Sequence, residues 1–244
     1  MSTFDDAWSA VVDVEGWMTR GQGAALDEAA RRAPEGGTIV EIGSFQGRST
    51  IVLAKAAPPN AAVIAIDPHA GNDRGPQQYH GFAEAADADH AAFTANLAAA
   101  GVADRVTHLR MFSDAALSEI AGPIDVLYID GAHRYGPARA DIRNWGSRLA
   151  DGGTMLIHDS FSSIGVTLAI LRELLLGRRL RYVGRSRSLA IYRADLEGRS
   201  IVNAARQLTQ LPWFVKNVML KVALTLGLGK LARRLGRPVP EWPY

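Results

Sequence analysis

The chain has 244 residues, a net charge of +2 and no cysteine. Its 48% hydrophobic and 21% charged residues are the balance of a globular protein, which excludes a fibrous or mostly disordered chain. The lack of cysteine excludes disulfides, thiolate metal sites and cysteine nucleophiles. The first ten residues show no basic stretch followed by an apolar run, so we expect no signal peptide and a cytoplasmic protein.

The positive charge is concentrated at the C-terminal end. Residues 196–244 contain eight Lys or Arg against two Glu, a net charge of +6, which leaves −4 for residues 1–195. A basic tail alone is weak evidence for a nucleic-acid partner, and we predict none. It fits a helix that binds a membrane surface or another protein at least as well.

Strands and helices are predicted to alternate along the body of the chain. Short apolar, β-branched runs predict strands at 38–42, 62–66, 106–109, 124–129 and 154–157. Helices are predicted at 23–33, 49–57 and 88–100, and an amphipathic helix after 165 precedes two short strands near 180–183 and 189–192. Strands separated by crossover helices predict a doubly wound, mostly parallel α/β sheet with helices on both faces. Such sheets bind ligands beyond the carboxyl ends of their strands.

Residues 70–87 interrupt this alternation. They are rich in Gly, Ala and polar residues and form a longer connection than a βα loop usually has. Two interpretations stay open: a lid or acceptor-binding loop, and a tolerated surface insertion.

The tail is predicted to be mostly helical over 196–235. The apolar stretch 211–229 has Lys216 and Lys221 near its middle, so it is a poor membrane-spanning candidate. Its apolar face would contain Trp213, Phe214, Val218, Val222 and Leu226, opposite Lys216, Asn217 and Lys221. This face predicts peripheral membrane contact, or packing on the body or on a second copy of the chain, which we favour. We therefore divide the chain into a body, 1–195, and a basic amphipathic helical extension, 196–244.

A glycine pair joins the first predicted strand to its helix. The segment reads Glu41-Ile-Gly-Ser-Phe-Gln-Gly-Arg-Ser-Thr50, with Gly43 and Gly47 at G-x-x-x-G spacing. This spacing differs from the G-x-G-x-x-G of dinucleotide binders, and no Gly-Lys-Ser/Thr follows as it would in a P-loop. Asp67, at the end of the second strand, is placed to accept hydrogen bonds from a ribose diol. The pattern predicts a site for a nucleoside-like cofactor and disfavours an NAD-dependent oxidoreductase.

This segment resembles motif I of the class I S-adenosylmethionine (SAM)-dependent methyltransferases, which have a Rossmann-like fold. It is particularly similar to the metal-dependent small-molecule O-methyltransferases of the catechol kind. Residues 93–117 look like that family's segment around the third strand, and the resemblance runs from about Glu15 to Arg193.

The resemblance implies a set of cofactor-binding residues. Glu41, Gly43 and Ser44 would lie against the methionine part of SAM, Asp67 against the ribose, and Phe112 and Ser113 against the adenine. Gly47, Ser49 and Asp130 complete the implied set. The segment 16–19 looks like the family's cap over the cofactor; plain core packing is the alternative for Trp17 and Met18.

A second cluster of polar residues follows the strands at 124–129 and 154–157. Asp130 and Asp159 should lie side by side at one sheet edge, where two carboxylates repel unless a positive group sits between them. A bound Mg²⁺ would resolve this repulsion, since it prefers oxygen ligands. Helix capping is the alternative for the two aspartates, and a solvated loop residue is the alternative for His133.

The resemblance also implies roles for this cluster. In the metal-dependent family the aspartate at position 130 is a metal ligand, and a basic residue at position 133 removes the acceptor's proton. The catechol enzymes have lysine there, whereas His133 is similar to the sugar and antibiotic O-methyltransferases with an IDGAH motif. Asp159 is an implied ligand, and His158 and Ser160 compete for the third place.

The sequence therefore predicts a SAM-dependent O-methyltransferase, with Mg²⁺ orienting the acceptor and His133 as general base. The polar loop 70–87 and the IDGAH resemblance favour a sugar or glycosylated metabolite as the acceptor. A catechol or phenol is the first alternative. A non-catalytic module of the same fold, with a membrane- or partner-binding tail, is an alternative of another class.

Overall fold

The computed structural model describes residues 3–70, 83–195 and 199–226. Most of loop 70–87, with Tyr79, His80 and Phe82, lies outside the described residues, as does the tail beyond Leu226. The predictions for those segments stay predictions.

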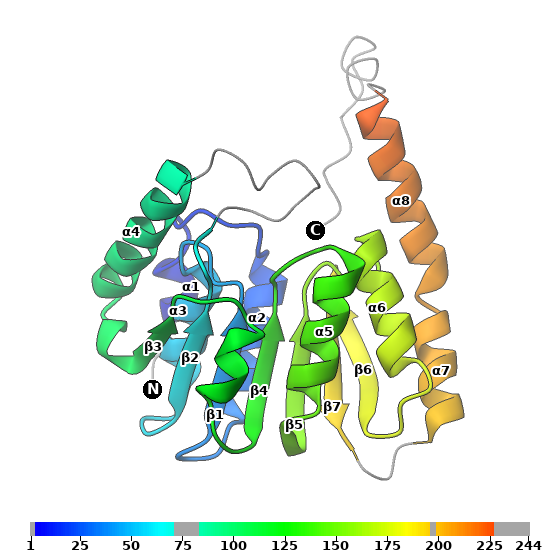
Figure 1. Cartoon of the computed structure of the whole chain (residues 1–244), viewed down its shortest axis with the longest axis horizontal. Helices are drawn as coiled ribbons and strands as arrows, with labels where there is room; N and C mark the ends of the chain where they lie inside the picture. The colour runs from blue at the N-terminus through cyan, green and yellow to red at the C-terminus, as the bar shows by residue number, and fades with distance from the viewer. Residues whose placement is uncertain (1–2, 71–82, 196–198, 227–244) are drawn as a thin grey trace.

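Seven strands form one sheet in the order β3-β2-β1-β4-β5-β7-β6 (Figure 1). The strands are β1 (Thr38–Ile42), β2 (Ala62–Ile66), β3 (Val106–Leu109), β4 (Ile124–Ile129), β5 (Leu149–Ile157), β6 (Leu180–Ser186) and β7 (Leu189–Ala194). The first five pair in parallel, and β7 pairs antiparallel with β5 and β6. The predicted Rossmann-like, mostly parallel sheet is confirmed. The chain order reverses on either side of β1, so the strand ends at β1 and β4 frame a ligand crevice.

The helices and short 3₁₀ turns connect these strands. They are α1 (Phe4–Ser9), α2 (Arg20–Arg31), α3 (Arg48–Ala56), α4 (Ala83–Ala99), η1 (Ala103–Arg105), η2 (Ala115–Ser118), α5 (Tyr135–Gly146), α6 (Ile164–Leu174), α7 (Ser200–Leu208) and α8 (Leu211–Thr225). Sequence analysis named no helix at α1 or α5. A Thr3–Asp6 capping box begins α1, and Pro137 lies in the first turn of α5, where its missing N–H costs no intrahelical hydrogen bond.

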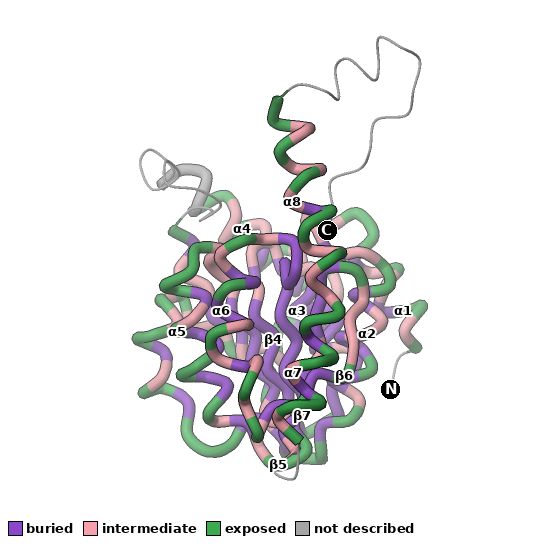
Figure 2. The backbone as a smooth tube through the Cα atoms, turned by 90° about the vertical axis from the view of Figure 1, so that its right-hand side faces the viewer, coloured by how far each residue is buried: buried purple, intermediate pink, exposed green. Residues whose placement is uncertain are grey.

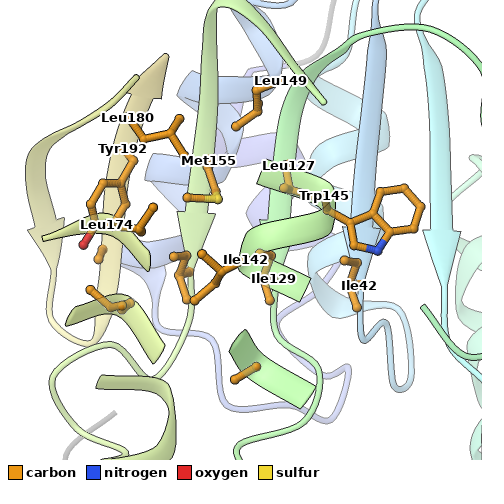
Figure 3. Packing of buried hydrophobic residues seen from close by; sticks show 14 of the residues in the cluster. Ile42, Leu127, Ile129, Ile142, Trp145, Leu149, Met155, Leu174, Leu180 and Tyr192 are labelled. Carbon is orange, nitrogen blue, oxygen red and sulfur yellow. The ribbon is translucent and has the colours of Figure 1, made fainter. Parts of the chain in front are cut away.

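The sheet has a hydrophobic core on each face. One core joins the sheet to α5 and α6 through residues such as Ile142, Trp145 and Ile170. Figure 3 shows Ile142 and Trp145 of α5 beside Ile129 and Ile42 of the strands. The other core joins α2 and α3 to the opposite face and includes Phe93 and Leu97 of α4. Strands covered on both faces are the reason for the continuous apolar runs in the sequence.

Helix α7 is fixed to the body by buried amides. The side-chain nitrogen of Asn203 donates to the carbonyls of Leu174 and Leu180, and its oxygen accepts from the Tyr182 amide. Gln207 donates to the Leu174 carbonyl in the same way. Because buried amides are costly to leave unpaired, these hydrogen bonds fix the start of the C-terminal extension against β6.

Helix α8 leaves the body after its first turns. Trp213 and Phe214 pack against the hydrophobic core. Asn217 is buried and donates to the carbonyl of Phe161 at 3.0 Å. Beyond this point the helix projects past the carboxyl ends of the strands, and Figure 2 shows it mostly exposed or half-buried. Asn217 therefore faces the body, and its placement on a polar face opposite Trp213 is wrong.

The predicted helical C-terminal extension is confirmed over 199–226. Within the described part of the chain, no helix is long and apolar enough to cross a lipid bilayer.

Candidate active site

A cavity of about 420 Å³ opens at the carboxyl ends of β1, β2 and β4. This volume lies within the range of roughly 300–1,000 Å³ typical of small-molecule sites. The lining residues come from the strand-end loops, from α5 and from the segment before α2. They include Trp17, Gly43, Phe45, Asp67, Phe112, Ser113, Asp130, His133 and Asp141.

At Gly43 the loop after β1 comes close to the loop after β4. Gly43 has a φ of +87°, and a Cβ there would lie 2.3 Å from the carbonyl oxygen of Asp130. A side chain would therefore push these loops apart and fill the crevice between β1 and β4. The backbone of motif I is left open to a ligand, as a cofactor-binding glycine requires.

Asp67 orders the motif I loop from the end of β2. One carboxylate oxygen accepts hydrogen bonds from the amides of Ser44 and Phe45, each at 2.9 Å. The other oxygen accepts from the amide of His69 at 2.8 Å. Asp67 also lines the cavity. The same carboxylate therefore orders the motif I loop and is placed to contact a ligand in the cavity.

Glu41 and Ser49 lie beneath the loop rather than on the cavity wall. Glu41 is fully buried, and the hydroxyls of Ser49 and Thr50 donate to its carboxyl group. Burial raises the pKa of Glu41 to about 8, although the two hydroxyl donors act in the opposite direction. This neutral carboxyl group ties β1 to the first turn of α3. Gly47, with a φ of +89°, packs on Leu97 of α4 and also lies off the lining.

The cavity lining includes a buried acid, Asp141, that sequence analysis missed. Ser113 donates to a carboxylate oxygen of Asp141 at 2.5 Å, and both residues line the cavity beside Phe112. Burial raises the pKa of Asp141 to about 6 despite the hydroxyl donor. Had α5 been predicted, the apolar neighbours Ala138, Ile142 and Trp145 would have marked Asp141 as facing inward at helical spacing.

Two histidines surround the carboxylate of Asp130 at the end of β4. Nδ1 of His158 lies 2.9 Å from Oδ1 of Asp130, and Nε2 of His133 lies 3.9 Å from the same oxygen. Tyr128 donates to the other oxygen at 2.8 Å. Burial favours a raised pKa at Asp130, but the two histidines outweigh it and hold that pKa below its usual range. Asp130 is therefore a carboxylate in this site.

Asp159 approaches the same group from the end of β5. Its Oδ2 lies 3.2 Å from Nε2 of His133, and Ser162 donates to its Oδ1 at 2.9 Å. Asp159 has a φ of +54°, a left-handed conformation that aspartate tolerates better than most residues. The structure thus brings Asp130, His133, His158 and Asp159 together. Ser160 points away, because its buried hydroxyl donates to the carbonyl of Ile157.

In the described residues, Asp130, His133 and His158 are the one group whose ligand atoms lie within 4.8 Å of one another. Two imidazole nitrogens and one carboxylate are typical of transition metals, whereas Mg²⁺ takes oxygen ligands. The group therefore fits Mg²⁺ poorly. Nε2 of His133 lies close to both aspartates, at the place where the sequence analysis expected a cation.

A second histidine cluster borders the cavity near α4. The rings of His69, His90 and His108 lie 5.0 to 5.2 Å apart between centroids. Nε2 of His69 lies 2.9 Å from the Phe45 carbonyl, so this ring supports the motif I loop. Burial lowers the pKa of His108 to about 4, with His69 and His90 adding to the effect. Among the described residues, these three do not form a metal-ligand group.

Comparisons with known proteins agree with this geometry. Residues 40–160 match the family model described as a methyltransferase domain. Similar solved structures include cofactor-bound Rv0187 from MTB, at 21% identity and a TM-score of 0.54 over 80% of this chain and 88% of that one. The O-methyltransferase TomG from Streptomyces achromogenes, in complex with SAM, has 19% identity and a TM-score of 0.54 over 78% and 88%. The Bacillus cereus O-methyltransferase, in complex with SAH, has 17% identity and a TM-score of 0.55, over 79% of this chain and 89% of that one.

The fold, the open motif I glycine and the strand-end cavity define a class I SAM-dependent methyltransferase. Residues 40–160 match the methyltransferase-domain family model, and the sheet that contains them has the Rossmann-like strand order of this class. The resemblance noted in the sequence is confirmed at this level.

Proposed function

We propose that the protein transfers a methyl group from SAM to a hydroxyl group of a small molecule. The observation that carries this proposal is the position of His133, which lines the cavity beside Gly43 and Asp67 and lies 3.2 Å from the carboxylate of Asp159. A base at the mouth of a cofactor cavity is what an alcohol needs in order to attack an electrophilic methyl group.

The cavity has the features that SAM needs. Its lining includes the backbone of Gly43 and the carboxylate of Asp67. We assign Gly43 and Ser44 to the methionine part, Asp67 to the ribose, and Phe112 with Ser113 to the adenine. When bound, SAM would supply a sulfonium methyl group that an oxygen nucleophile attacks, with the C–S bond breaking and SAH leaving.

His133 moves the proton in this reaction. As the acceptor oxygen forms its bond to carbon, the imidazole takes the hydroxyl proton and becomes an imidazolium. The carboxylate of Asp159 stabilises that cation at 3.2 Å, and Asp130 adds a second negative charge at 3.9 Å. General-base catalysis of this kind contributes roughly 10²–10⁴ in rate.

Mg²⁺ orienting the acceptor was the prediction from the sequence. Because Asp130, His133 and His158 fit Mg²⁺ poorly, no step here passes through a metal. A transition-metal ion held by His133 would also remove the base. We therefore propose that the acceptor is positioned by protein groups alone.

We propose a sugar or a glycosylated metabolite as the acceptor. The IDGAH sequence at 129–133 supports this choice. A screen with labelled SAM should show methyl transfer to glycosides. Transfer to catechols with none to any saccharide would overturn the choice of acceptor.

A further inference from the structure

One face of α5 forms a wall of the cofactor cavity. It consists of Pro137, Ala140, Asp141, Asn144 and Trp145, whose spacing of three and four residues places them on one side of the helix. We call this face the α5 wall. Two of its polar side chains are buried, Asp141 at 5% exposure and Trp145 at 1%. The proton transfer to His133 uses neither of them, so their place on the cavity needs a separate explanation.

The carboxylate of Asp141 has one oxygen that is occupied and one that is open. Its Oδ1 accepts from the hydroxyl of Ser113 at 2.5 Å, whereas its Oδ2 accepts no hydrogen bond from any residue that the structure describes. Oδ2 lies 3.5 Å from the place that a Cβ would take at Gly131, so the cavity-lining loop after β4 leaves this side uncovered. Because a buried polar group is costly without a partner, Oδ2 is suited to a donor on a ligand in the cavity.

Burial raises the pKa of Asp141 to about 6, although the Ser113 hydroxyl acts in the opposite direction. At pH 8 the side chain is therefore a carboxylate, which accepts hydrogen bonds and donates none.

The α5 wall also contains a donor without an acceptor. The indole Nε1 of Trp145 is buried and has no hydrogen-bond partner in the part of the chain that the structure describes. Trp145 follows Asp141 by four residues, which is about one turn of the helix. The wall therefore offers an open acceptor and an open donor next to each other.

Phe112 supplies a flat apolar surface in the same part of the lining. It is 54% exposed and precedes Ser113, the residue that holds Asp141. The loop with both residues follows β3, which pairs with β2, the strand that ends at Asp67. Aromatic rings bind flat bases by stacking on their faces, while polar groups read the base edges. A base attached to a ribose at Asp67 therefore fits beside Phe112 with its edge toward the α5 wall.

We propose that Asp141 determines which base the cofactor carries, because its carboxylate accepts a hydrogen bond from the exocyclic amino group of adenine. This inference rests on the proposed function and adds a specificity-determining residue to it. Adenine presents an amino donor beside a ring-nitrogen acceptor, which complements Asp141 and Trp145. Hypoxanthine presents a carbonyl oxygen in place of the amino group, and that oxygen would face the carboxylate and repel it. The α5 wall thus selects adenine.

Three ligands that differ only in this group of the base test the proposal. They are SAH, its analogue with an unsubstituted purine and its analogue with hypoxanthine. Calorimetric titration into the full-length protein at pH 8 measures each Kd without turnover. We expect the wild type to bind SAH roughly ten- to a hundredfold more tightly than either analogue, as a hydrogen bond to a charged group provides. Equal affinities for the three ligands would overturn the proposal.

Two variants of Asp141 assign the preference to its carboxylate. Asp141→Leu has a similar shape and no acceptor, so it should bind the three ligands with affinities within about threefold of one another. Asp141→Asn keeps an acceptor oxygen without the charge and should retain part of the preference, which provides a second test if the leucine variant does not fold. A merely structural role would weaken all three ligands equally and leave the wild-type preference unchanged, and this result would contradict the proposal.

Asp114 provides the matched control. It is a neighbouring acid on the same cavity lining, but its carboxylate caps η2 by accepting from the Ala115 amide at 2.9 Å. Asparagine caps a helix about as well as aspartate does, so Asp114→Asn should keep the wild-type preference for SAH. Loss of the preference in Asp114→Asn, with none in Asp141→Leu, would assign the amino group to Asp114 and overturn the proposal.

The SAH affinity of the wild type separates this inference from the proposed function. A folded wild type that binds none of the three ligands refutes the methyltransferase function, and the role of Asp141 is refuted with it. Binding of SAH without a preference for the amino group leaves the proposed function standing and refutes the role of Asp141 alone.

Discussion

Nε2 of His133 lies 3.2 Å from Oδ2 of Asp159, and this contact links the loop after β4 to the loop after β5. The register that pairs Ile129 with Ile157 brings the two loops to one edge of the sheet. The pair is a base and a carboxylate that can stabilise its protonated form, which is the arrangement that orients catalytic histidines in many enzymes.

Removing this base should slow methyl transfer while leaving the cofactor site intact. We expect His133→Ala to lower kcat by about 10²–10⁴, measured with labelled SAM and a glycoside acceptor. Asp159→Asn should lower kcat less, and asparagine suits the φ of +54° at this position. SAH affinity of both variants should match the wild type. Wild-type turnover in His133→Ala would refute its role.

Metal ions should inhibit this enzyme rather than support it. Two imidazoles and a carboxylate at Asp130, His133 and His158 suit Zn²⁺, and a bound ion would occupy the lone pair of the base. We expect EDTA to leave activity unchanged and micromolar Zn²⁺ to lower it. Activity lost in EDTA and restored by Mg²⁺ would instead support the metal predicted from the sequence.

The buried carboxyl group of Glu41 should make stability fall as pH rises. The unfolded chain ionises near pH 4.5, whereas the folded protein keeps the proton until about pH 8. The stabilisation that this group gives the folded state is fully present below pH 4.5. Between pH 4.5 and about 8 the free energy of unfolding falls by up to about 1.4 kcal/mol per pH unit, and above about pH 8 it levels off. Glu41→Gln keeps a neutral side chain and should flatten the dependence in urea unfolding curves between pH 5 and 8. An unchanged slope in the variant would show that Glu41 is ionised in the fold.

Gly165 positions the base through the backbone. A Cβ at Gly165 would lie 2.3 Å from the His133 carbonyl oxygen, so Gly165→Ala should displace the loop and lower kcat. Overpacking of this kind costs roughly 1–3 kcal/mol. Gly136→Ala is the matched control, since nothing lies within 4 Å of its Cβ and alanine favours a helix by about 0.5–1 kcal/mol. Equal stability and kcat in the two variants would contradict the positioning role.

The sheet was predictable because its inner strands β1 and β4 are almost entirely buried. Runs such as 38–42 and 124–129 are therefore mostly apolar, apart from residues such as Glu41 and Asp125, and their short length and β-branched residues identify them as strands. Helix α5 was not predicted because Gly136 and Pro137 are typical of a turn, although both are compatible with the first turn of a helix. Asp141 was missed for the same reason, since its inward direction exists only once the helix is known.

The sequence predicted which residues of the candidate site follow the strand ends. It did not predict which of their side chains contact one another. Asp130, His133 and Asp159 follow strand ends, and parallel pairing brings them together. The sequence could not show that His158 would turn toward Asp130, or that the hydroxyl of Ser160 would turn back to the Ile157 carbonyl. Both depend on the left-handed turn at Asp159 and Phe161. The direction of Asn217 likewise depends on where α8 meets the body.

The most direct test of the account is calorimetric titration of SAH into the wild-type protein and into Phe112→Ala. Phe112 is 54% exposed on the cavity wall, so its removal spares the core, and Val12→Ala, at 56% exposure, is the matched control. The account predicts a roughly micromolar Kd for the wild type and the control. It predicts a loss of about five- to a hundredfold in Phe112→Ala, from the loss of stacking on the adenine. No SAH binding by the folded wild type, or an unchanged Kd in Phe112→Ala, would contradict the assignment of this cavity to SAM.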